Sequence, residues 1–309
     1  DYNKPAGTYN IAFNLQALPQ VTQYYMQDLV NTVEDPNLTT RVCTETPTMV
    51  MDKRDGHTYA IARLKDGKCW MVQNLRLGEN LEPVTGSLTL TDEDTNISTT
   101  DEYNPRSTFT LTNQVVDGKM PEKAMTDPVG GSIGYIYDGP AFYCTNDYGC
   151  YYNFYTATAG IKSEGSGTDT VTTKNTDVTT TICPKNWTLP TGGDHQTSEY
   201  PNHSSDLYST GKAYGVGTDS IHDILLKILA LPVGATENIN GTYIPGFLLG
   251  GVYYSGGAYG EIGTYGRYWA RTVPSAIYGN GLYLATASFN FNDRLNRYDG
   301  RSVRCLLQE

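Results

Sequence analysis

The sequence predicts an α+β fold in which two helices accompany many short strands. Apolar residues recur at helical spacing over residues 18–33 and again over 221–230, and a proline follows each segment. Elsewhere, glycine and Asp-Gly turns separate short apolar runs that are typical of strands. The sequence shows no regular repeat with a period of 20–50 residues.

The N-terminal third supplies a strand, a helix and a three-stranded meander. In residues 1–14, apolar and polar residues alternate after a Pro-Ala-Gly turn, which predicts a strand at the end of an upstream domain or in a linker. The main domain is expected over residues 15–309. Over 18–33 the spacing of Val21, Tyr25, Leu29 and Val33 predicts an amphipathic helix. Residues 48–77 predict three strands, because turn signals occur at Asp55-Gly56 and Asp66-Gly67.

Two polar segments interrupt the middle of the chain. Residues 78–130 are irregular and 161–182 are threonine-rich, so both are interpreted as surface insertions. The aromatic stretch between them, 143–160, is expected to pack on the core. The second helix is predicted at 221–230, where Ile221, Ile224, Leu225, Ile228 and Leu229 form one stripe after Ser220 and before Pro232.

Composition restricts the function classes. The net charge of −11 lacks the positive footprint that phosphate backbones require, so no nucleic-acid partner is expected. No apolar run approaches the roughly 20 residues that span a bilayer. The chain begins at Asp1, so we expect any secretion signal or membrane anchor to have been removed or to lie outside it.

Six cysteines without a CxxC motif predict a disulfide framework and an extracellular setting. The spacing alone leaves 15 pairings open. Only the short separation of Cys144 and Cys150 suggests a pair, which would close a small loop.

The C-terminal region predicts a binding surface. Residues 246–268 are dominated by glycine and tyrosine, and asparagine and arginine follow, which is the composition of antibody-like contact surfaces. Because alternate residues of a strand face inward, about half of the candidates are expected to be buried. The candidate ligand-binding residues are Tyr253, Tyr254, Tyr259, Tyr265, Arg267, Tyr268, Arg271, Tyr278, Asn280, Asn290, Asn292, Asp293, Arg294, Asn296, Arg297 and Tyr298.

Metal binding is the weaker interpretation of two polar clusters. The first cluster has no zinc-site spacing and is interpreted as a solvated loop; it contains Asp194, His195, Glu199, His203 and Asp206. The second offers hard oxygen ligands, so calcium is the only cofactor considered, but the glycine and distal glutamate of an EF-hand are missing; it contains Asp92, Glu93, Asp94 and Asn96. No metal site is therefore predicted.

Catalysis is not expected either. The sequence contains no GxSxG nucleophile motif, and its carboxylate pairs arise by chance in an acidic chain. Its glycine-rich stretches lack the Gly-Lys-Ser/Thr of a phosphate loop. Trp70, Trp187 and Trp269 are interpreted as core residues.

Five ordered motifs resemble the Fibrobacter succinogenes major paralogous domain family of bacterial surface proteins. They cover roughly residues 43–307 and are RDGHTYAIARLKDGKCWMVQNL, YYNFYTATAG, CPKNWTLPTGG, YW-x-x-T and GRSVRC. One departure is Ala270-Arg271-Thr272, where the family usually has Ser-Ser-Thr. The resemblance implies a C-type-lectin-like fold, close to formylglycine-generating enzymes. Such a fold has two main helices, short, mostly antiparallel strands and long loop insertions.

The same resemblance implies specific pairings and a role. Cys183 would pair with Cys305, and Cys43 with Cys69. Variable proteins of diversity-generating retroelements share this superfamily, so the segment between Tyr265 and Tyr298 could be diversified. The expected function is that of an adhesin-like module on the cell surface or secreted, which binds a protein or glycan on another cell or surface. The alternative is a structural subunit or tip of a fibre or pilus. A cryptic enzyme is the third and less expected function. The oligomeric state stays open.

Overall fold

The computed structural model describes about three fifths of the chain. The described residues are 22–83, 85–112, 115, 139–161, 176–192, 205–207, 209, 238–239, 242–243, 250–254, 259–274, 278–285 and 289–308. The predicted N-terminal strand at 1–14 and the predicted helix at 221–230 lie outside them.

The first sheet is an antiparallel meander, extended by two short strands from the C-terminal half. β1 pairs with β2 and β2 with β3, which confirms the three strands predicted over 48–77. Gly56 and Gly67 in the turns have φ of 76° and 80°, a region that residues with a Cβ rarely adopt. The strand order is β1 (Thr48–Met51), β2 (Thr58–Arg63), β3 (Cys69–Met71), β19 (Leu306–Leu307) and β9 (Trp187–Thr188).

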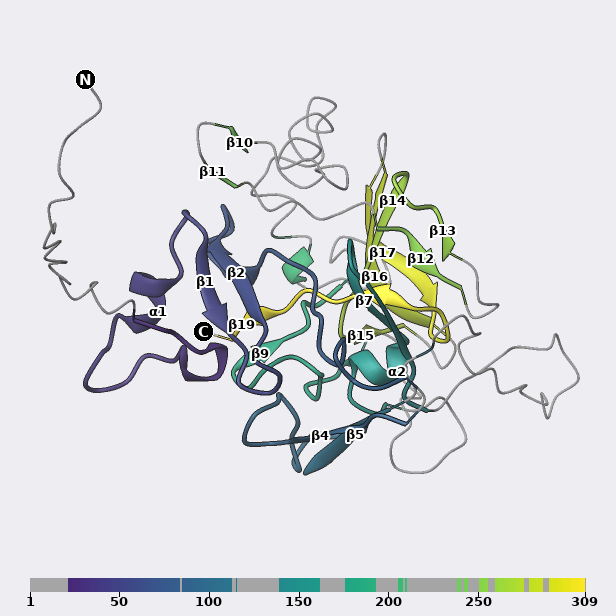
Figure 1. Ribbon diagram of the computed structural model, residues 1–309, viewed down its shortest axis with the longest axis horizontal. Helices are drawn as coiled ribbons and strands as arrows, with labels where there is room; N and C mark the ends of the chain where they lie inside the picture. The colour runs from purple at the N-terminus through teal and green to yellow at the C-terminus, as the bar shows by residue number, and fades with distance from the viewer. Residues whose placement is uncertain are drawn as a thin grey trace, which may run out of the picture.

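The second sheet has six strands and holds most of the C-terminal region. Its strands are antiparallel except β14 and β18, which pair in parallel at Tyr268 and Ser302. Figure 1 shows β14, β16 and β17 on the opposite side of the molecule from β1 and β2. The strand order is β17 (Phe289–Asn296), β16 (Tyr278–Ala285), β14 (Tyr265–Trp269), β18 (Arg301–Ser302), β7 (Gly149–Tyr152) and β6 (Phe142–Thr145).

Four two-stranded ladders accompany the two sheets. Two of them, β12–β13 and β10–β11, pair strands that are close in the sequence, whereas β8 pairs with the distant β15. The ladders are β4 (Leu88–Thr91) with β5 (Thr108–Leu111), β8 (Thr176–Asp177) with β15 (Thr272–Val273), β10 (Asn238–Ile239) with β11 (Thr242–Tyr243), and β12 (Val252–Tyr253) with β13 (Tyr259–Gly260).

The helices of the described residues are few and short, which corrects the α+β prediction. They are a 3₁₀ turn η1 (Met26–Asp28), the α-helices α1 (Leu38–Val42) and α2 (Phe154–Ala157), and a helical turn that includes residues 206, 207 and 209. The described part of the chain is therefore mostly β-sheet. The expected C-type-lectin-like arrangement with two main helices is wrong as a description of it.

Tertiary hydrogen bonds explain why the described part of segment 18–33 forms no long helix. The indole of Trp187 donates to the carbonyl of Met26 at 2.9 Å, and the amide of Asn186 donates to the carbonyl of Gln27 at 2.7 Å. These carbonyls are therefore bonded to the β9 region. Val33, expected on the apolar stripe, is 94% exposed.

Each of the two predicted surface insertions contributes some of its described residues to the core. In the first, Leu90, Phe109 and Leu111 of the β4–β5 hairpin are buried. In the second, Val178 and Ile182 are buried too. The polar backbone there is satisfied by a carboxylate, because Asp101 accepts hydrogen bonds from the amides of Thr179 and Thr180, each at 2.8 Å.

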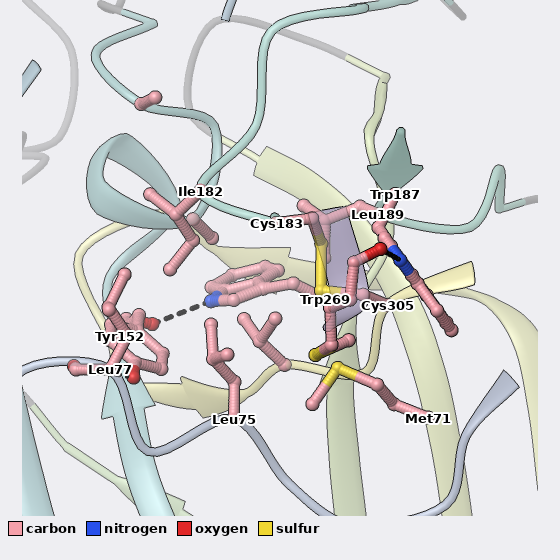
Figure 2. Packing of buried hydrophobic residues seen from close by; sticks show 14 of the residues in the cluster. Met71, Leu75, Leu77, Tyr152, Ile182, Cys183, Trp187, Leu189, Trp269 and Cys305 are labelled. Atoms are coloured by element: carbon pink, nitrogen blue, oxygen red, sulfur yellow. Dashed lines mark hydrogen bonds between the residues drawn. A yellow bond between two sulfur atoms is a disulfide. The ribbon is translucent and has the colours of Figure 1, made fainter. Parts of the chain in front are cut away.

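One apolar cluster joins the two sheets, as Figure 2 shows. Trp70, Trp187 and Trp269 are each 0% exposed, which confirms their predicted core role. The indole of Trp269 donates to the carbonyl of Tyr152 at 2.7 Å, so its only polar atom is satisfied. The predicted packing of residues 143–160 on the core is confirmed by the buried strand β7 and helix α2.

Three disulfides cross-link the fold. They join Cys43 to Cys69, Cys144 to Cys150, and Cys183 to Cys305, as expected from the short loop and from the family resemblance. Figure 2 shows the last of them beside Trp269. Disulfides persist in oxidising compartments, which supports an extracellular setting. In the part of the chain that the structure describes, no helix has the length and apolarity to cross a bilayer.

Candidate functional site

The tyrosine-rich C-terminal region forms one end of the six-stranded sheet. β14 pairs with β16, which pairs with β17, so three strands lie side by side. Arg267 lies opposite Tyr283, and Tyr265 lies opposite Ala285. Residues opposite one another in antiparallel strands share a face, so Tyr265, Arg267 and Tyr283 project from the same face.

This face passes from the core to the molecular surface along the strands. Trp269 and Leu295 belong to it and are buried. Gly279 gives the room for that packing, because a Cβ there would lie 2.5 Å from the ring of Phe154. Tyr265, Arg267 and Tyr283 at the other end are only partly buried. The core therefore anchors strands whose far end is accessible.

Arg267 is the centre of the accessible end. Its Nε and Nη2 donate to the two carboxylate oxygens of Glu261 at 2.7 and 3.1 Å, and its Nη1 donates to Oδ2 of Asp293 at 3.0 Å. The guanidinium also lies 5.0 Å from the ring centroid of Tyr283 and 5.9 Å from that of Tyr265. Since the two rings are 5.1 Å apart, one arginine orders both tyrosines and both carboxylates.

The turn before β14 completes the accessible end. Glu261 has a φ of 66° and accepts a backbone hydrogen bond from Thr264 at 3.0 Å, which brings its side chain back towards Arg267. The next residue, Ile262, is 42% exposed. Tyr254, which follows β12, is 38% exposed and covers Gly260 so closely that a Cβ there would lie 2.2 Å from its ring.

Burial and ion pairing set the charges of this cluster. Burial lowers the pKa of Arg267, but its hydrogen bonds with Glu261 and the negative charges of Glu261 and Asp293 together outweigh burial and raise the pKa overall. Burial raises the pKa of Asp293, and the nearby Arg267 only partly opposes that effect. Burial, followed by the charge of Glu261, raises the pKa of Tyr254.

A second arginine lies beneath the cluster. Arg301 of β18 donates to Oδ2 of Asp299 at 3.0 Å, and both side chains are 3% exposed. Its guanidinium lies 5.8 Å from the ring of Trp269. Burial lowers the pKa of Arg301 to about 10. Arg301 therefore connects the charged end of the face to its apolar core.

The structure divides the predicted ligand-binding residues into three groups. Ten have side chains that are exposed or partly buried: Tyr254, Tyr265, Arg267, Arg271, Tyr278, Asn290, Asp293, Arg294, Asn296 and Tyr298. Four are buried: Tyr253, Tyr268, Asn280 and Arg297. The side chains of Tyr259 and Asn292 lie outside the described residues.

The buried group has structural contacts. Tyr253 stacks on Tyr143 with ring centroids 4.5 Å apart. Arg297 donates to the carbonyl of Ile161 at 3.1 Å and lies 4.9 Å from the ring of Phe154. Of the partly buried residues, Arg271 is also tied down, because it donates to the carbonyl of Val178 at 3.0 Å. We leave these residues out of the site.

Sequence reasoning missed Tyr283, Glu261 and Ile262 at the accessible end, and the buried Arg301 beneath it. Tyr283 lies on β16, opposite Arg267 on β14. The sequence could have placed Tyr283 on the same face as Tyr265 and Arg267 only if the register of these two strands had been known. Glu261 is brought in by a turn with an unusual φ, and Arg301 by a strand of two residues. Neither carries a local sequence signal.

Three residues of the weaker candidate sites, Asp206, Asp94 and Asn96, make structural contacts, whereas Asp92 and Glu93 are exposed. Asp206 accepts hydrogen bonds from the amide and hydroxyl of Thr191 at 2.8 and 2.9 Å and pairs with Lys68. Asp94 accepts from the amide of Thr91 at 3.1 Å, and Asn96 donates to the carbonyl of Thr179 at 2.9 Å. Asp194, His195, Glu199 and His203 lie outside the described residues. No group of three or more metal-ligating side chains occurs among the residues that are described.

Comparison of the chain with protein-family models, with curated proteins and with solved structures found no match.

Proposed function

We propose that the protein is an extracellular ligand-binding module and that its contact site is the accessible end of the C-terminal sheet. We call this site the Tyr–Arg surface and define it by Tyr254, Glu261, Ile262, Tyr265, Arg267, Tyr283 and Asp293. The observation that carries the proposal is the stacking of two partly exposed tyrosines beside an arginine that two carboxylates hold in place. The family resemblance supports the same role.

The cluster suits binding because it is ordered before a ligand arrives. Association costs about 0.5–1.5 kcal/mol for each flexible side chain that is immobilised. Arg267 already has three of its nitrogens bonded, and the two rings that it contacts are held by the same network. The partner then gains aromatic contact area without ordering these side chains anew.

The composition of the surface matches that of energetically dominant contacts. Tyrosine and arginine are enriched among residues whose truncation costs about 2 kcal/mol or more at an interface. Ile262, which is 42% exposed, and Tyr254, which is 38% exposed, add apolar area beside the charged network. The expected partner is a protein or glycan on another cell or surface.

The test is a screen of a glycan array and a cell-surface protein array with the wild-type chain and with Tyr265→Ala. For any ligand found, we expect the variant to weaken binding by about tenfold or more, as for a central contact residue. Met49→Ala on β1 is the control, because Met49 is 51% exposed and belongs to the other sheet. Equal losses in the two variants, or a loss in the control alone, would count against the proposed surface.

The fibre alternative has its own measurement. Sedimentation velocity of the wild-type chain over a wide concentration range would reveal self-association. If Tyr265→Ala abolished an assembly of identical chains and left array binding unchanged, the structural-subunit interpretation would replace the binding module.

The retroelement prediction also becomes specific. We expect diversified codons to map to exposed positions such as Asn290 and Arg294 and to spare Tyr268 and Asn280, which are 1% and 0% exposed. Sequencing the locus for a template repeat and a reverse transcriptase tests this. A repeat whose variable positions fell on the buried residues would contradict the proposed surface.

A further inference from the structure

The Tyr–Arg surface carries more negative than positive charge. Arg267 pairs with both Glu261 and Asp293, so one guanidinium neutralises only one of two carboxylates. Arg301 does not correct the difference, because it pairs with Asp299 at 3.0 Å and both side chains are 3% exposed. The network of two arginines and three carboxylates therefore has an excess of one negative charge.

This excess charge is accessible on Asp293. Among the described residues, Arg267 is the only hydrogen-bond donor to this carboxylate, and it donates to Oδ2 at 3.0 Å. Oδ1 has no donor among the same residues, whereas both carboxylate oxygens of Glu261 accept a hydrogen bond from Arg267. The side chain of Asp293 is 25% exposed. A carboxylate accepts several hydrogen bonds, so Oδ1 is available to a donor of a partner.

Two aromatic rings lie around the same arginine. The ring centroids of Tyr265 and Tyr283 are 5.1 Å apart, and they lie 5.9 and 5.0 Å from the guanidinium of Arg267. Both tyrosines are partly buried. The face of an aromatic ring attracts a cation, and the attraction is stronger where water is partly excluded. The carboxylate and the two rings therefore favour the same kind of ligand group, which is a cation.

We propose that the Tyr–Arg surface binds a protein that presents a lysine or arginine side chain, which pairs with Asp293 and packs against Tyr265 and Tyr283. The proposal rests on the proposed function, because it takes the Tyr–Arg surface as the contact site. It narrows the partner from a protein or glycan to a protein with a basic contact residue.

Charge disfavours the other partners. A sulfated or carboxylated glycan would bring negative charge to a surface that already has an excess of it. Nε and Nη1 of Arg301 have no hydrogen-bond partner in the described part of the chain, but the 3% exposure of this side chain keeps an anion in solvent away from them. A second copy of the chain would be repelled, because each copy has a net charge of −11. A neutral glycan would leave the excess charge unpaired.

A capped octalysine peptide is the probe, and a capped octaglutamate peptide is its opposite-charge control. We expect calorimetric titration of the wild-type chain at low salt to show saturable binding of octalysine and no binding of octaglutamate. Raising NaCl to about 150 mM should weaken octalysine binding several-fold, because charges are then screened beyond about 8 Å. Binding of octaglutamate in place of octalysine would overturn the proposal.

Asp293→Asn is the decisive variant. Asparagine keeps an oxygen that accepts the hydrogen bond from Arg267 and removes the charge, so the surface keeps its shape. We expect octalysine to bind this variant about three- to tenfold more weakly, as for a partly buried charge pair.

Asp92→Asn is the matched control, because it removes the same charge from an exposed residue that directly follows β4. Figure 1 shows the β4–β5 hairpin well away from β14. The control should therefore change octalysine binding by less than about 1.5-fold. Equal losses in Asp293→Asn and Asp92→Asn would mean that net charge alone attracts the peptide, and would overturn the proposal.

The contact with the rings has a separate test. Tyr265→Phe keeps the ring and should bind octalysine as the wild type does. Tyr265→Leu removes the ring and should bind octalysine about threefold more weakly, or less tightly still. Equal binding of octalysine by the two variants would contradict the proposed packing of the cation on the ring.

The arrays separate the charge of the partner from the location of the surface. A ligand that depends on Tyr265 but binds Asp293→Asn and wild type equally would overturn the basic partner and leave the Tyr–Arg surface in place. If no ligand depends on Tyr265, and octalysine binds Asp293→Asn and wild type equally, both the basic partner and the surface are wrong.

Discussion

Removal of the Cys183–Cys305 disulfide should destabilise this protein more than removal of either other disulfide. The perturbation is the double substitution Cys183→Ala/Cys305→Ala. The bridge joins residues 122 apart in sequence, so it restricts the unfolded chain more than bridges of 26 and 6 residues do. In the chain-entropy model, removal of this bridge lowers the free energy of unfolding by about 5 kcal/mol. Removal of Cys43–Cys69 lowers it by about 3.5 kcal/mol, and removal of Cys144–Cys150 by about 2 kcal/mol.

The two bridges that close the longer loops are equally buried, so their removal can be compared without a difference in burial. Cys43, Cys69, Cys183 and Cys305 are each 0% exposed, so the cavities left by alanine are similar in the two double variants. The difference of about 1.5 kcal/mol then reports loop length. Because whole-domain stabilities are typically about 5–15 kcal/mol, the Cys183–Cys305 variant should be close to unfolding in buffer.

The assay is urea unfolding of the three double-alanine variants without reductant, so that the other two bridges of each variant stay intact, followed by far-UV circular dichroism. The expected order of unfolding free energy places the Cys144–Cys150 variant highest and the Cys183–Cys305 variant lowest. The loop-entropy reasoning is refuted if the Cys144–Cys150 variant is as unstable as the Cys183–Cys305 variant.

Three further predictions concern single residues. Gly251→Ala should lower the unfolding free energy by several kcal/mol in urea titrations, because its φ is +68° and a Cβ would lie 2.1 Å from the carbonyl oxygen of Gly260; an unchanged midpoint would contradict this. Asn153→Ala should cost about 1–2 kcal/mol by the same assay, since Asn153 caps α2 by accepting the amide of Thr156 at 2.9 Å, and Asn153→Asp should recover part of it. The third residue is Asp101, whose pKa is lowered. Burial opposes this shift, but hydrogen bonds from Thr179 and nearby backbone amides outweigh burial. The stability that ionised Asp101 contributes to the fold is therefore present above pH 3.8 and lost as pH falls. Asp101→Asn should flatten the acid limb of the stability profile, and an unaltered acid limb would disprove that role.

The proposed surface differs from the one that composition suggests. The tyrosine content of the C-terminal region predicts a broad contact area, whereas in the structure only some of these tyrosines lie on an accessible face. Tyr253 of β12 and Tyr268 of β14 are buried, whereas Tyr265 and Tyr283 belong to the accessible end of the six-stranded sheet. A binding site of this kind is therefore smaller than its sequence region and is ordered by one arginine.

The edge of this sheet carries features that limit unwanted pairing. β17 is an edge strand, and between its pairs with Gly281 and Tyr283 it contains one residue more than β16. Such a bulge twists an edge and interrupts its hydrogen-bonding pattern. The charged Asp293 and Arg294 are adjacent to it. These features favour side-chain contacts on the Tyr–Arg surface over strand addition at the edge.

Local chemistry in the sequence was sufficient for several elements. The β1–β2–β3 meander follows from two Asp-Gly turns, because glycine accepts the positive φ that each turn requires. The Cys144–Cys150 bridge follows from a separation of six residues. The core role of the three tryptophans follows from their size and apolarity.

Other features depended on partners that are distant in sequence. The apolar spacing over 18–33 predicted a helix, but side chains near residue 187 hold the carbonyls of residues 26 and 27 in a different conformation. Alternation along β14 and β16 divides their residues into two faces, but it does not say which part of a face the core covers. Only the packing of Trp269 and Phe154 at one end, and the Glu261–Arg267–Asp293 network at the other, decides that. The physical reason is that turns and caps depend on neighbours in sequence, whereas burial depends on which surfaces meet when the whole chain has folded.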